Sequence, residues 1–560
     1  MNGLILLVIS IVVLSLAYLF YGRFLARSWG IDRKRKTPAY EFEDGKEYVP
    51  TSPAVVFGYE FASIAGAGPI NGPIIAAMFG WFPAILWLLF GAAFFGAAHD
   101  FVALYASVHN KGKSIGYVIE LYVGKTGKRL FLIFIWLFSI LIAAAFSSIV
   151  AGTFAGFSSA GDPIRTNASV ASSSSLFIIA AIGLGFLIRR RKASDLASAI
   201  IAIDLLIVCI ALGIFFPVFL DERIWLYLVF IYIFIASVVP IWVVGQPRNY
   251  LNSFLLIAMI LAAFLGVIFT APKIEIPAFT AFNVNGNYLF PTLFVTIACG
   301  AISGFHSLVV TGAVSKQISS EKYMLPISYG AMLVETLLAV LALIAVGSLA
   351  KGGLLPGEAP PVVFAMAVSG FLSQLGLPSQ VSFTIVSLAV SSFVLTTLDT
   401  VARLGRLSFQ ELFSIEEEGY HGNFIGRILR SKPATSIVTL LPAFLLAIFG
   451  YQNIWVLFGA SNQLLAALTL IACMLFFKKT GRKIYMLFVP TVIMLVVTYS
   501  SLIISIKERV VLLLHGSSNF PVLVLQIGIA LLLLVLGIIV AFSCAIKLLE
   551  KDNNGKKVKK

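Results

Sequence analysis

The chain has 560 residues, of which 59% are hydrophobic and 12% charged, and its mean hydropathy is +0.99. One water-soluble core could not bury so much apolar surface, which excludes a soluble globular protein and indicates an integral membrane protein. The net charge of +15 does not indicate nucleic-acid binding, because the basic residues lie in short connections between apolar runs. We therefore expect a single polytopic membrane domain over residues 1–560 and no nucleic-acid partner.

Apolar runs recur along the whole chain and predict an all-α fold. A spanning helix needs roughly 20 residues, which gives about fifteen transmembrane segments, or up to about eighteen if broken ones are split. The first run, residues 4–20, lacks the basic region and cleavage site of a secretory signal. It is predicted to stay in place as the first helix, with its N-terminus outside.

Cations are concentrated in the connections that follow odd-numbered segments, and the positive-inside rule places such connections in the cytoplasm. The alternative, that basic residues are scattered at helix ends regardless of side, does not account for this alternation. A basic tail likewise predicts a cytoplasmic C-terminus. The basic residues assigned to the cytoplasm are Arg33–Lys36, Lys111, Lys113, Lys125, Lys128, Arg189–Lys192, Arg248, Lys316, Lys322, Arg403, Arg406, Lys478–Lys483, Lys556, Lys557, Lys559 and Lys560.

Residues 54–80 are apolar enough to span a membrane, yet the stretch IAGAGPINGPIIAAMFG within them is rich in helix breakers. Each Pro removes a hydrogen-bond donor and disfavours helix at the preceding residue. Because lipid offers backbone groups no partners, an unwound turn is stable only in the protein interior or beside a watery cavity. We predict a broken helix in which Gly66, Gly68, Asn71 and Gly72 bind substrate. The alternative is that the glycines only permit close helix packing.

Three carboxylates in apolar segments are candidates for proton coupling, because an unpaired charge in a membrane is costly and usually functional. They are Asp100, Asp204 and Glu335. Asp204 and Glu335 have no local partner, so each either carries a proton or pairs with a distant basic residue. Asp100 follows His99, but adjacent helical side chains point about 100° apart, so these two are not expected to form one site by themselves.

A second broken helix is predicted over residues 288–313, where Gly300 and Gly304 interrupt TIACGAISGFHSLV. An odd number of crossings separates it from the first, so the two run in opposite directions, as in an inverted repeat. Paired breaks point to a transporter's substrate site, because half-helix ends present free N–H groups and carbonyls. His306 either orients substrate or carries a proton. Close packing is again the alternative for the glycines.

The segment 378–406 is predicted to face the first break. In broken-helix transporters the third element of the second repeat supplies hydroxyls to a sodium site, and this segment holds several Ser and Thr in an apolar setting. The alternative is that these hydroxyls bond to carbonyls of their own helix. The hydroxyls of the segment include Ser391, Ser392, Thr396 and Thr397, and the candidate sodium ligands are Ala62, Ala65, Ser391, Ser392 and Thr396.

Near the end of that segment Asp399 precedes Arg403 by one helical turn, which predicts a structural ion pair. The following residues 435–547 are predicted to form accessory helices. Within them Asn462 and Gln463 are expected to hold neighbouring helices together.

Several sequence features are absent. The chain has no G-x-x-x-x-G-K-[ST], HExxH or G-x-S-x-G motif, which argues against an ATP-driven motor on this chain and against an enzyme. The cysteines also lack CxxC spacing, so neither a zinc site nor a disulfide-bonded framework is predicted. We expect no cofactor other than sodium or protons as the coupling ion. The cysteines, which read as small core residues, are Cys209, Cys299, Cys473 and Cys544.

Seven stretches spread over most of the chain form a specific combination. They are YVPT (Tyr48–Thr51), FASIAGAGPINGPI (Phe61–Ile74), HDF (His99–Phe101), PRNYL (Pro247–Leu251), TIACGAISGFHSLV (Thr296–Val309), TTLDTVAR (Thr396–Arg403) and FGASNQLLAA (Phe458–Ala467). In these stretches the sequence resembles the carbon starvation protein A (CstA) family of bacterial peptide and pyruvate transporters. It departs from the family where Tyr59 and Glu60 stand in place of expected His residues, and where Asn249 stands in place of Asp.

The resemblance implies a secondary transporter of the bacterial plasma membrane, with an inverted-repeat core like that of LeuT-type amino-acid transporters and additional helices. We expect it to import small peptides or pyruvate-like carboxylates by alternating access, driven by a proton or sodium gradient. A channel or membrane nutrient sensor is the alternative, because filters and re-entrant loops also use unwound backbone. The expected partners are the substrate and membrane lipid, without an ATPase subunit.

Overall fold

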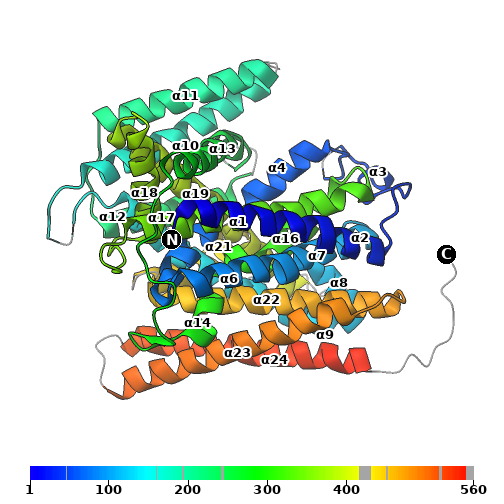
Figure 1. Cartoon of the computed structure of the whole chain (residues 1–560). Coiled ribbons are helices and arrows are strands. Elements are labelled where there is room, and N and C mark those ends of the chain that lie inside the picture. Colours follow the sequence, from blue (N-terminus) through cyan, green and yellow to red (C-terminus); the bar gives the residue numbers. More distant parts are fainter. Residues whose placement is uncertain are drawn as a thin grey trace.

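The computed structural model describes residues 1–45, 47–158, 160–191, 195–240, 245–414, 431–448, 452–515 and 520–549. It is an assembly of helices, most of which lie along one common direction (Figure 1). A short antiparallel hairpin joins β1 (Asn283–Val284) to β2 (Asn287–Tyr288) outside this bundle. The all-α class predicted from the apolar runs is confirmed.

The helices include several short 3₁₀ and π-helical turns, labelled η. In chain order they are α1 (Gly3–Leu16), η1 (Ala17–Gly22), α2 (Arg23–Trp29), α3 (Pro38–Glu41), α4 (Pro53–Ile64), α5 (Gly68–Ala76), η2 (Ala77–Phe79), α6 (Trp81–Gly91), η3 (Ala92–Gly96), α7 (Ala97–His109), α8 (Ile115–Val123), α9 (Lys125–Phe154), α10 (Arg165–Arg191), α11 (Asp195–Phe215), α12 (Glu222–Val238), α13 (Gly245–Thr270), α14 (Leu289–Thr296), α15 (Ala298–Ala301), α16 (Gly304–Gly312), η4 (Val314–Lys316), η5 (Glu321–Tyr323), η6 (Leu325–Tyr329), α17 (Gly330–Leu349), α18 (Pro360–Gln374), α19 (Ser379–Ser414), α21 (Lys432–Ala447), α22 (Gln452–Lys479), α23 (Tyr485–Leu514) and α24 (Phe520–Leu549).

The predicted number of membrane segments is not confirmed. Among the described residues, ten helices are long and apolar enough to cross a membrane, or eleven if the bent pair α4–α5 counts as one span. The sequence count was higher because it also included apolar helices of sub-membrane length. Helices α12, α18 and α21 have only 17, 15 and 16 residues.

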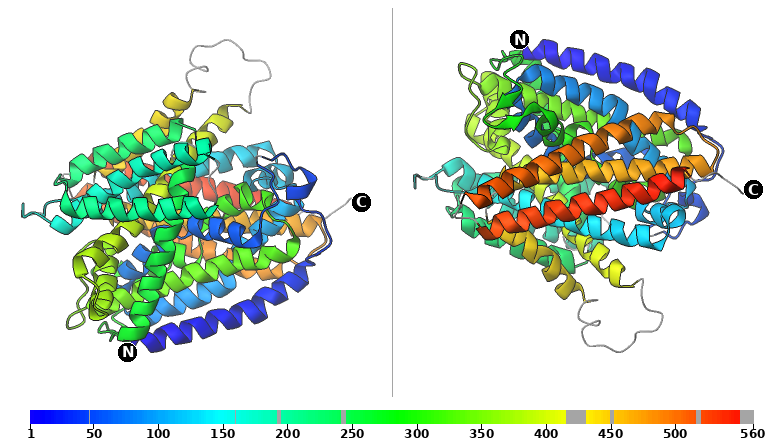
Figure 2. Two further views of the ribbon diagram at one scale, coloured as in Figure 1. Left: turned by 90° about the horizontal axis from the view of Figure 1, so that it is seen from above. Right: turned by 90° about the horizontal axis from the view of Figure 1, so that it is seen from below.

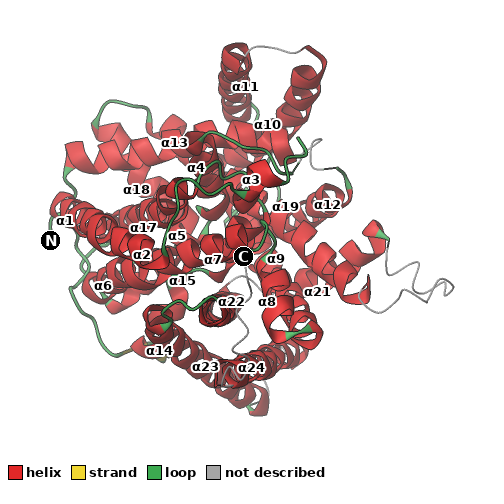
Figure 3. Cartoon of the chain, turned by 90° about the vertical axis from the view of Figure 1, so that its right-hand side faces the viewer, coloured by secondary structure: helices red, strands yellow, loops and turns green. Residues whose placement is uncertain are grey.

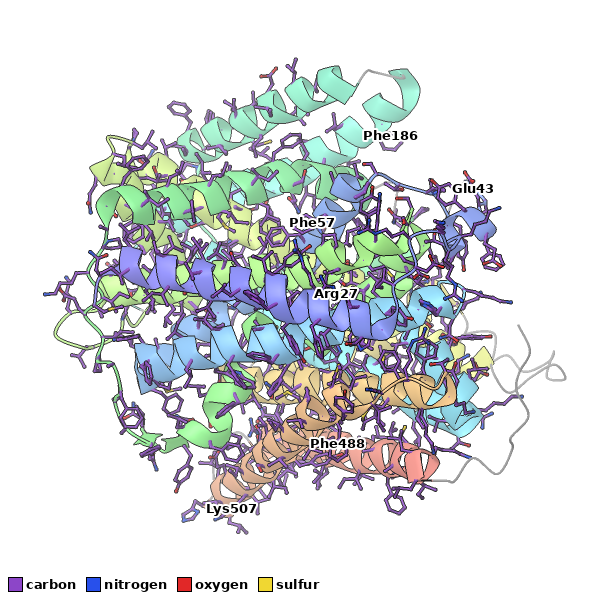
Figure 4. The ribbon with its side chains drawn as sticks, turned by 45° about the vertical axis from the view of Figure 1, so that its right-hand side comes forward. Arg27, Glu43, Phe57, Phe186, Phe488 and Lys507 are labelled. Atoms are coloured by element: carbon purple, nitrogen blue, oxygen red, sulfur yellow. The ribbon has the colours of Figure 1, made fainter. Side chains whose placement is uncertain are left out.

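The connections assigned to the cytoplasm gather at one end of the bundle. Arg482 Nε donates to the backbone oxygen of Trp29 at 3.1 Å, and Lys316 Nζ lies 2.6 Å from a carboxylate oxygen of Glu47. Glu43 marks this end in Figure 4. The contacts agree with the predicted grouping of these connections on one side.

The cation-poor connections gather at the opposite end. Gly3 N donates to the backbone oxygen of Pro272 at 2.7 Å, and Glu275 N donates to that of Gly347 at 2.9 Å. Lys507 lies at this end in Figure 4. The N-terminus and the C-terminal end of α24 lie at opposite ends of the bundle (Figure 1), as the alternation of charges predicts for the two termini.

Both predicted helix breaks are present. Helices α4 and α5 are bent by 46° at the residues that separate Ile64 from Gly68. The second break separates α15 from α16 at Ile302 and Ser303, both of which have extended backbone conformations. It therefore falls between the two predicted glycines rather than at either of them.

Helix α22, which lies within the residues 435–547 predicted to form accessory helices, runs through the interior of the bundle. The most apolar 18-residue stretch within its span Ile454–Lys479 is entirely buried, whereas the corresponding stretches of α23 and α24 are 44% and 39% buried. In the end-on view of Figure 3, α22 is surrounded by other helices. The orange and red α23 and α24 cover it on the outside (Figure 2, right). All three helices are apolar enough to span a membrane, and their hydropathy was not used to separate buried from peripheral helices.

Candidate functional site

The two breaks are in direct contact. Gly68 packs against Cys299, and a Cβ atom on Gly72 would lie 2.6 Å from the backbone oxygen of Thr296. Only glycine permits so close an approach of two backbones. The glycines of the first break therefore allow its backbone to pack closely against the second break. This supports close helix packing, the alternative role considered for these glycines.

Unwinding leaves backbone groups of the first break without partners. Among the described residues, no backbone acceptor is found for the N–H groups of Ala67 and Gly68, and no backbone donor for the carbonyls of Ala62 and Ala65. The free N–H groups lie at the start of α5, where the helix dipole favours negative charge. The free carbonyls lie at the end of α4, where they favour a cation. The break thus offers opposite polarities within a few residues.

Asn71 follows these N–H groups and is fully buried. Neither its Oδ1 nor its Nδ2 has a hydrogen-bond partner among the described residues. A buried amide without partners costs about 1–3 kcal/mol. Asn71 is therefore suited to a ligand or water that would satisfy both atoms.

Side chains of α22 form hydrogen bonds with the segment that contains the second break. Asn462 Oδ1 accepts from Phe305 N at 3.0 Å, and Asn462 Nδ2 donates to Ser303 Oγ at 3.1 Å. Gln463 Nε2 donates to the backbone oxygen of Phe294 at 2.7 Å. The bond from Phe305 N satisfies a backbone group freed at the break, and the bonds to Ser303 and Phe294 join α22 to the neighbouring segment. The predicted role of Asn462 and Gln463 in holding helices together is confirmed.

The other two predicted glycines face neighbouring helices. A Cβ atom on Gly300 would lie 2.8 Å from Ala339 Cβ of α17. Gly304 packs against the backbone of α22 at Asn462. At these two positions the structure shows the close-packing role.

A buried cluster of ionisable side chains surrounds His306, on the first turn of α16. His306 Nδ1 lies 2.8 Å from Asp100 Oδ2 of α7, and His306 Nε2 lies 3.2 Å from Glu335 Oε2 of α17. All three side chains are 0 to 1% exposed. The structure thus brings together two of the three predicted proton-coupling candidates and the predicted histidine.

The cluster has two more members that sequence reasoning did not place there. His99 Nδ1 lies 2.8 Å from Asp100 Oδ1, in contrast to the expectation that these neighbours point apart. Glu60 of α4 is fully buried, interacts electrostatically with Asp100, His306 and Glu335, and has no hydrogen-bond partner among the described residues.

The arrangement constrains the protons in the cluster. A neutral imidazole carries one N–H, yet both ring nitrogens of His306 lie near carboxylate oxygens. Either His306 is a cation donating to both carboxylates, or one carboxyl group is protonated. Glu60, without a donor of its own, adds a third carboxyl group to the same buried space. Such a cluster can take up and release protons between its members.

Two other predictions about acidic residues differ from the structure. Asp204 is exposed on α11 and does not join the cluster. Asp399 forms its ion pair with Arg248 of α13, at 2.7 Å, rather than with Arg403. Tyr232 also donates to Asp399, at 3.0 Å. Because the two residues of this ion pair lie far apart in the sequence, no local sequence pattern could predict it.

The structure distributes the candidate sodium ligands of α19 over different surroundings. Ser391 Oγ lies 3.2 Å from Ser174 Oγ of α10, and Thr396 Oγ1 accepts from Asn252 of α13. Only Thr397 meets the first break, because its Oγ1 lies 3.0 Å from where a Cβ atom on Gly66 would be.

The alternative role for these hydroxyls is also seen. Ser391, Thr396 and Thr397 each donate to a carbonyl of α19, at 3.1, 2.9 and 3.2 Å respectively. Ser392 Oγ is buried without a described partner. Of the predicted ligands, Ala62 and Ala65 therefore lie at the break, and the hydroxyl of α19 beside them is that of Thr397.

A cavity of about 400 Å³ lies where α4, α16 and α19 meet. Its polar lining includes Ser63, Thr397, Thr400 and Arg403, and its apolar lining includes Val309. Nη2 of Arg403 is buried and has no hydrogen-bond partner among the described residues. The volume is that of a site for a small molecule. The lining also contains Asp399, which is paired with Arg248, so Nη2 of Arg403 is left to meet an anionic group.

Comparison of the sequence with known protein families identifies the family of this chain. The model of the family described as carbon starvation protein CstA matches residues 2–361 and 354–501. The chain belongs to the CstA family. This confirms the resemblance drawn from the seven sequence stretches and establishes a multi-pass membrane protein of a transporter family.

Relatives in the CstA family have been named as transporters. The peptide transporter CstA of Bacillus subtilis (strain 168) is 33% identical over 528 residues, which cover 84% of each chain. The pyruvate/proton symporter BtsT of Escherichia coli (strain K12) is 30% identical over 599 residues, covering 89% of this chain and 81% of the symporter. Among solved structures, MhsT in complex with L-phenylalanine aligns with 88% of this chain at 12% identity and a TM-score of 0.48.

Proposed function

We propose that this chain is a secondary active transporter that imports a small peptide or a pyruvate-like carboxylate, driven by the proton gradient through alternating access. The observation that carries the proposal is the contact of two broken helices beside a buried cluster of ionisable groups. Unwound backbone provides a substrate site, and the cluster provides a proton store. Membership of a family whose relatives are named as transporters supports the same conclusion.

We place the substrate at the first break. Its carboxylate would accept from the N–H groups of Ala67 and Gly68, and Asn71 would supply an amide to the rest of the molecule. The cavity lined by Arg403 would form the path between this site and one end of the bundle. A peptide and a keto acid share a carboxylate, so both fit this polarity.

We assign proton coupling to Asp100, His306 and Glu335, with Glu60 as a fourth participant. Two of these groups lie on half-helices next to the breaks, α4 and α16, and two lie on the unbroken α7 and α17. A rigid-body movement of the half-helices would therefore change the distances within the cluster, and with them its affinity for protons. Proton uptake would in turn favour one position of the half-helices.

Sodium remains the alternative coupling ion. The free carbonyls of Ala62 and Ala65 and the hydroxyl of Thr397 supply oxygen ligands of the kind that sodium needs. The cluster around His306 has no counterpart in a purely sodium-driven scheme, which is why we favour protons. We further assign the protein to the bacterial plasma membrane, with its basic end in the cytoplasm, and expect no enzymatic activity.

The test is uptake of radiolabelled alanyl dipeptides and pyruvate by proteoliposomes, with proton and sodium gradients imposed separately. We expect accumulation of one substrate class above its equilibrium level under a proton gradient alone. Accumulation under sodium alone would transfer the coupling role to the site at Ala62 and Thr397. Gradient-independent flux at channel-like rates would support a channel, and absence of flux for every substrate would remove the transporter assignment.

A further inference from the structure

A second cavity, of about 750 Å³, lies on the outside of the bundle between α2 and the turns η5 and η6. Its charged lining consists of Arg23, Arg27, Arg33 and Lys322, with a single acid, Glu321. The four cations are exposed. None of them forms an ion pair with a described carboxylate. The cavity therefore concentrates unneutralised positive charge.

The acidic residue of the lining, Glu321, already interacts with other groups of the protein. Glu321 Oε2 accepts from the backbone N–H of Asp32 at 2.8 Å, while Oε1 lies 3.5 Å from His109 Nε2 and 3.7 Å from Arg35 Nη1. Its side chain is fully buried. Glu321 thus fixes the chain segment after α2 against η5, and it leaves the cavity open to an external anion.

The cavity lies at the level of the lipid headgroups. About 20 helical residues cross the roughly 30 Å hydrocarbon layer, whereas the continuous helix Gly3–Trp29 has 27 residues. Its last turns, which carry Arg23 and Arg27, therefore extend into the headgroup layer. Tyr18 and Tyr323 also line the cavity, and such tyrosines are typical of this layer.

The helix beside the cavity faces lipid along its length. Only 28% of the apolar part of Gly3–Trp29 is buried inside the protein, and Phe20 and Phe24 are 72% and 49% exposed. This dark blue helix runs along the outer edge of the bundle in both views of Figure 2, and Figure 4 labels Arg27 on it. Acyl chains can lie against this surface while their headgroup reaches the cations.

We propose that this cavity binds the headgroup of an anionic phospholipid. The phosphate would accept from Arg and Lys side chains of both walls, which come from residues 23–33 and from residue 322. One lipid would therefore link the N-terminal helix to the beginning of α17. The proposal concerns a lipid site outside the transport path and does not depend on the proposed function.

The experiment uses the full-length protein in a mild detergent, titrated with phosphatidylglycerol or phosphatidylcholine. Binding is followed by the shift in Tm and by native mass spectrometry of retained lipid. We expect phosphatidylglycerol to bind and raise the Tm, and phosphatidylcholine to do neither. The triple variant R23Q/R27Q/K322Q should bind phosphatidylglycerol about 100-fold more weakly, with little change in the Tm of the lipid-free protein, because all three side chains are exposed.

The matched control is K113Q/K125Q/K483Q. It removes three exposed cations from the same end of the bundle, and none of them lines the cavity. Retention of lipid binding by this control supports a specific site. Equal weakening in both triple variants, undiminished binding in the first, or an equal Tm shift with inorganic phosphate alone would each overturn the lipid assignment.

Discussion

The imidazole of His306 and the carboxylate of Glu335 meet inside the protein, with Nε2 3.2 Å from Oε2 and almost no exposure of either side chain. One residue follows the second break, and the other lies on the unbroken α17. Their contact therefore joins a half-helix to a fixed helix through groups that can exchange protons.

Glu335→Gln keeps the shape of the side chain and removes its ability to carry a proton. We expect proton-driven accumulation of substrate to fall to the level reached without a gradient, while exchange of labelled for unlabelled substrate continues. Proteoliposome uptake and counterflow measure the two activities. The matched control is Asp204→Asn, at an exposed acid of α11, which should leave both unchanged. Normal accumulation by Glu335→Gln would rule out its coupling role.

Asn71→Ala should weaken substrate binding with little loss of stability. The side-chain polar atoms of Asn71 have no described partner, so truncation breaks no internal bond. We expect a KM increase of about tenfold, the value of one lost hydrogen bond of about 1.4 kcal/mol, with an unchanged Tm. A large fall in Tm with an unchanged KM would mean that Asn71 only shapes the turn.

Asn462→Ala should show the opposite pattern. This residue caps the second break through Phe305 and Ser303, so its removal leaves buried groups without partners. The cost is about 1–3 kcal/mol of unfolding free energy. Thermal unfolding of the purified protein measures it. If Asn462→Ala and Asn71→Ala gave the same profile, the division between capping and binding residues would be wrong.

Gly72→Ala should destabilise the contact between the breaks. The added methyl group would lie 2.6 Å from the backbone oxygen of Thr296, and overpacking of this kind costs about 1–3 kcal/mol. Gly58→Ala is the control, because nothing lies within 4 Å of its Cβ position in the same broken helix. The Tm of the two variants distinguishes them, and equal Tm values would contradict the close approach.

Asp399→Asn should be among the more destabilising single changes, because it leaves the charge of Arg248 buried and unpaired. Breaking a buried ion pair costs about 3–5 kcal/mol. The double variant Asp399→Leu/Arg248→Met removes both charges and should recover much of this loss. Arg403→Gln should cost less, since no ion pair to Asp399 is seen. A double variant no more stable than Asp399→Asn would show that the charges themselves are needed.

Local chemistry allowed some features to be predicted from sequence and not others. The break near Gly68 followed from Pro69 and Pro73, because proline acts on its own turn. The position of Trp29 and Arg482 at the same end of the bundle followed from the alternation of charges. The ion pair of Asp399 with Arg248 did not, since its partner lies on a distant helix. Nor did the central position of α22, because hydropathy alone does not distinguish lipid from protein neighbours.

The bonds from Asn462 to the second break join parts of the chain that are synthesised at different times. Phe305 and Asn462 are 157 residues apart, so the ribosome must produce α22 before the turn at Ser303 can be capped. Until then the unwound backbone has no side chain from α22 to satisfy it in the membrane. Assembly of the site therefore waits for about the last fifth of the protein. A chain truncated before α22 is expected to leave the second break uncapped, although the residues of both breaks have already been synthesised.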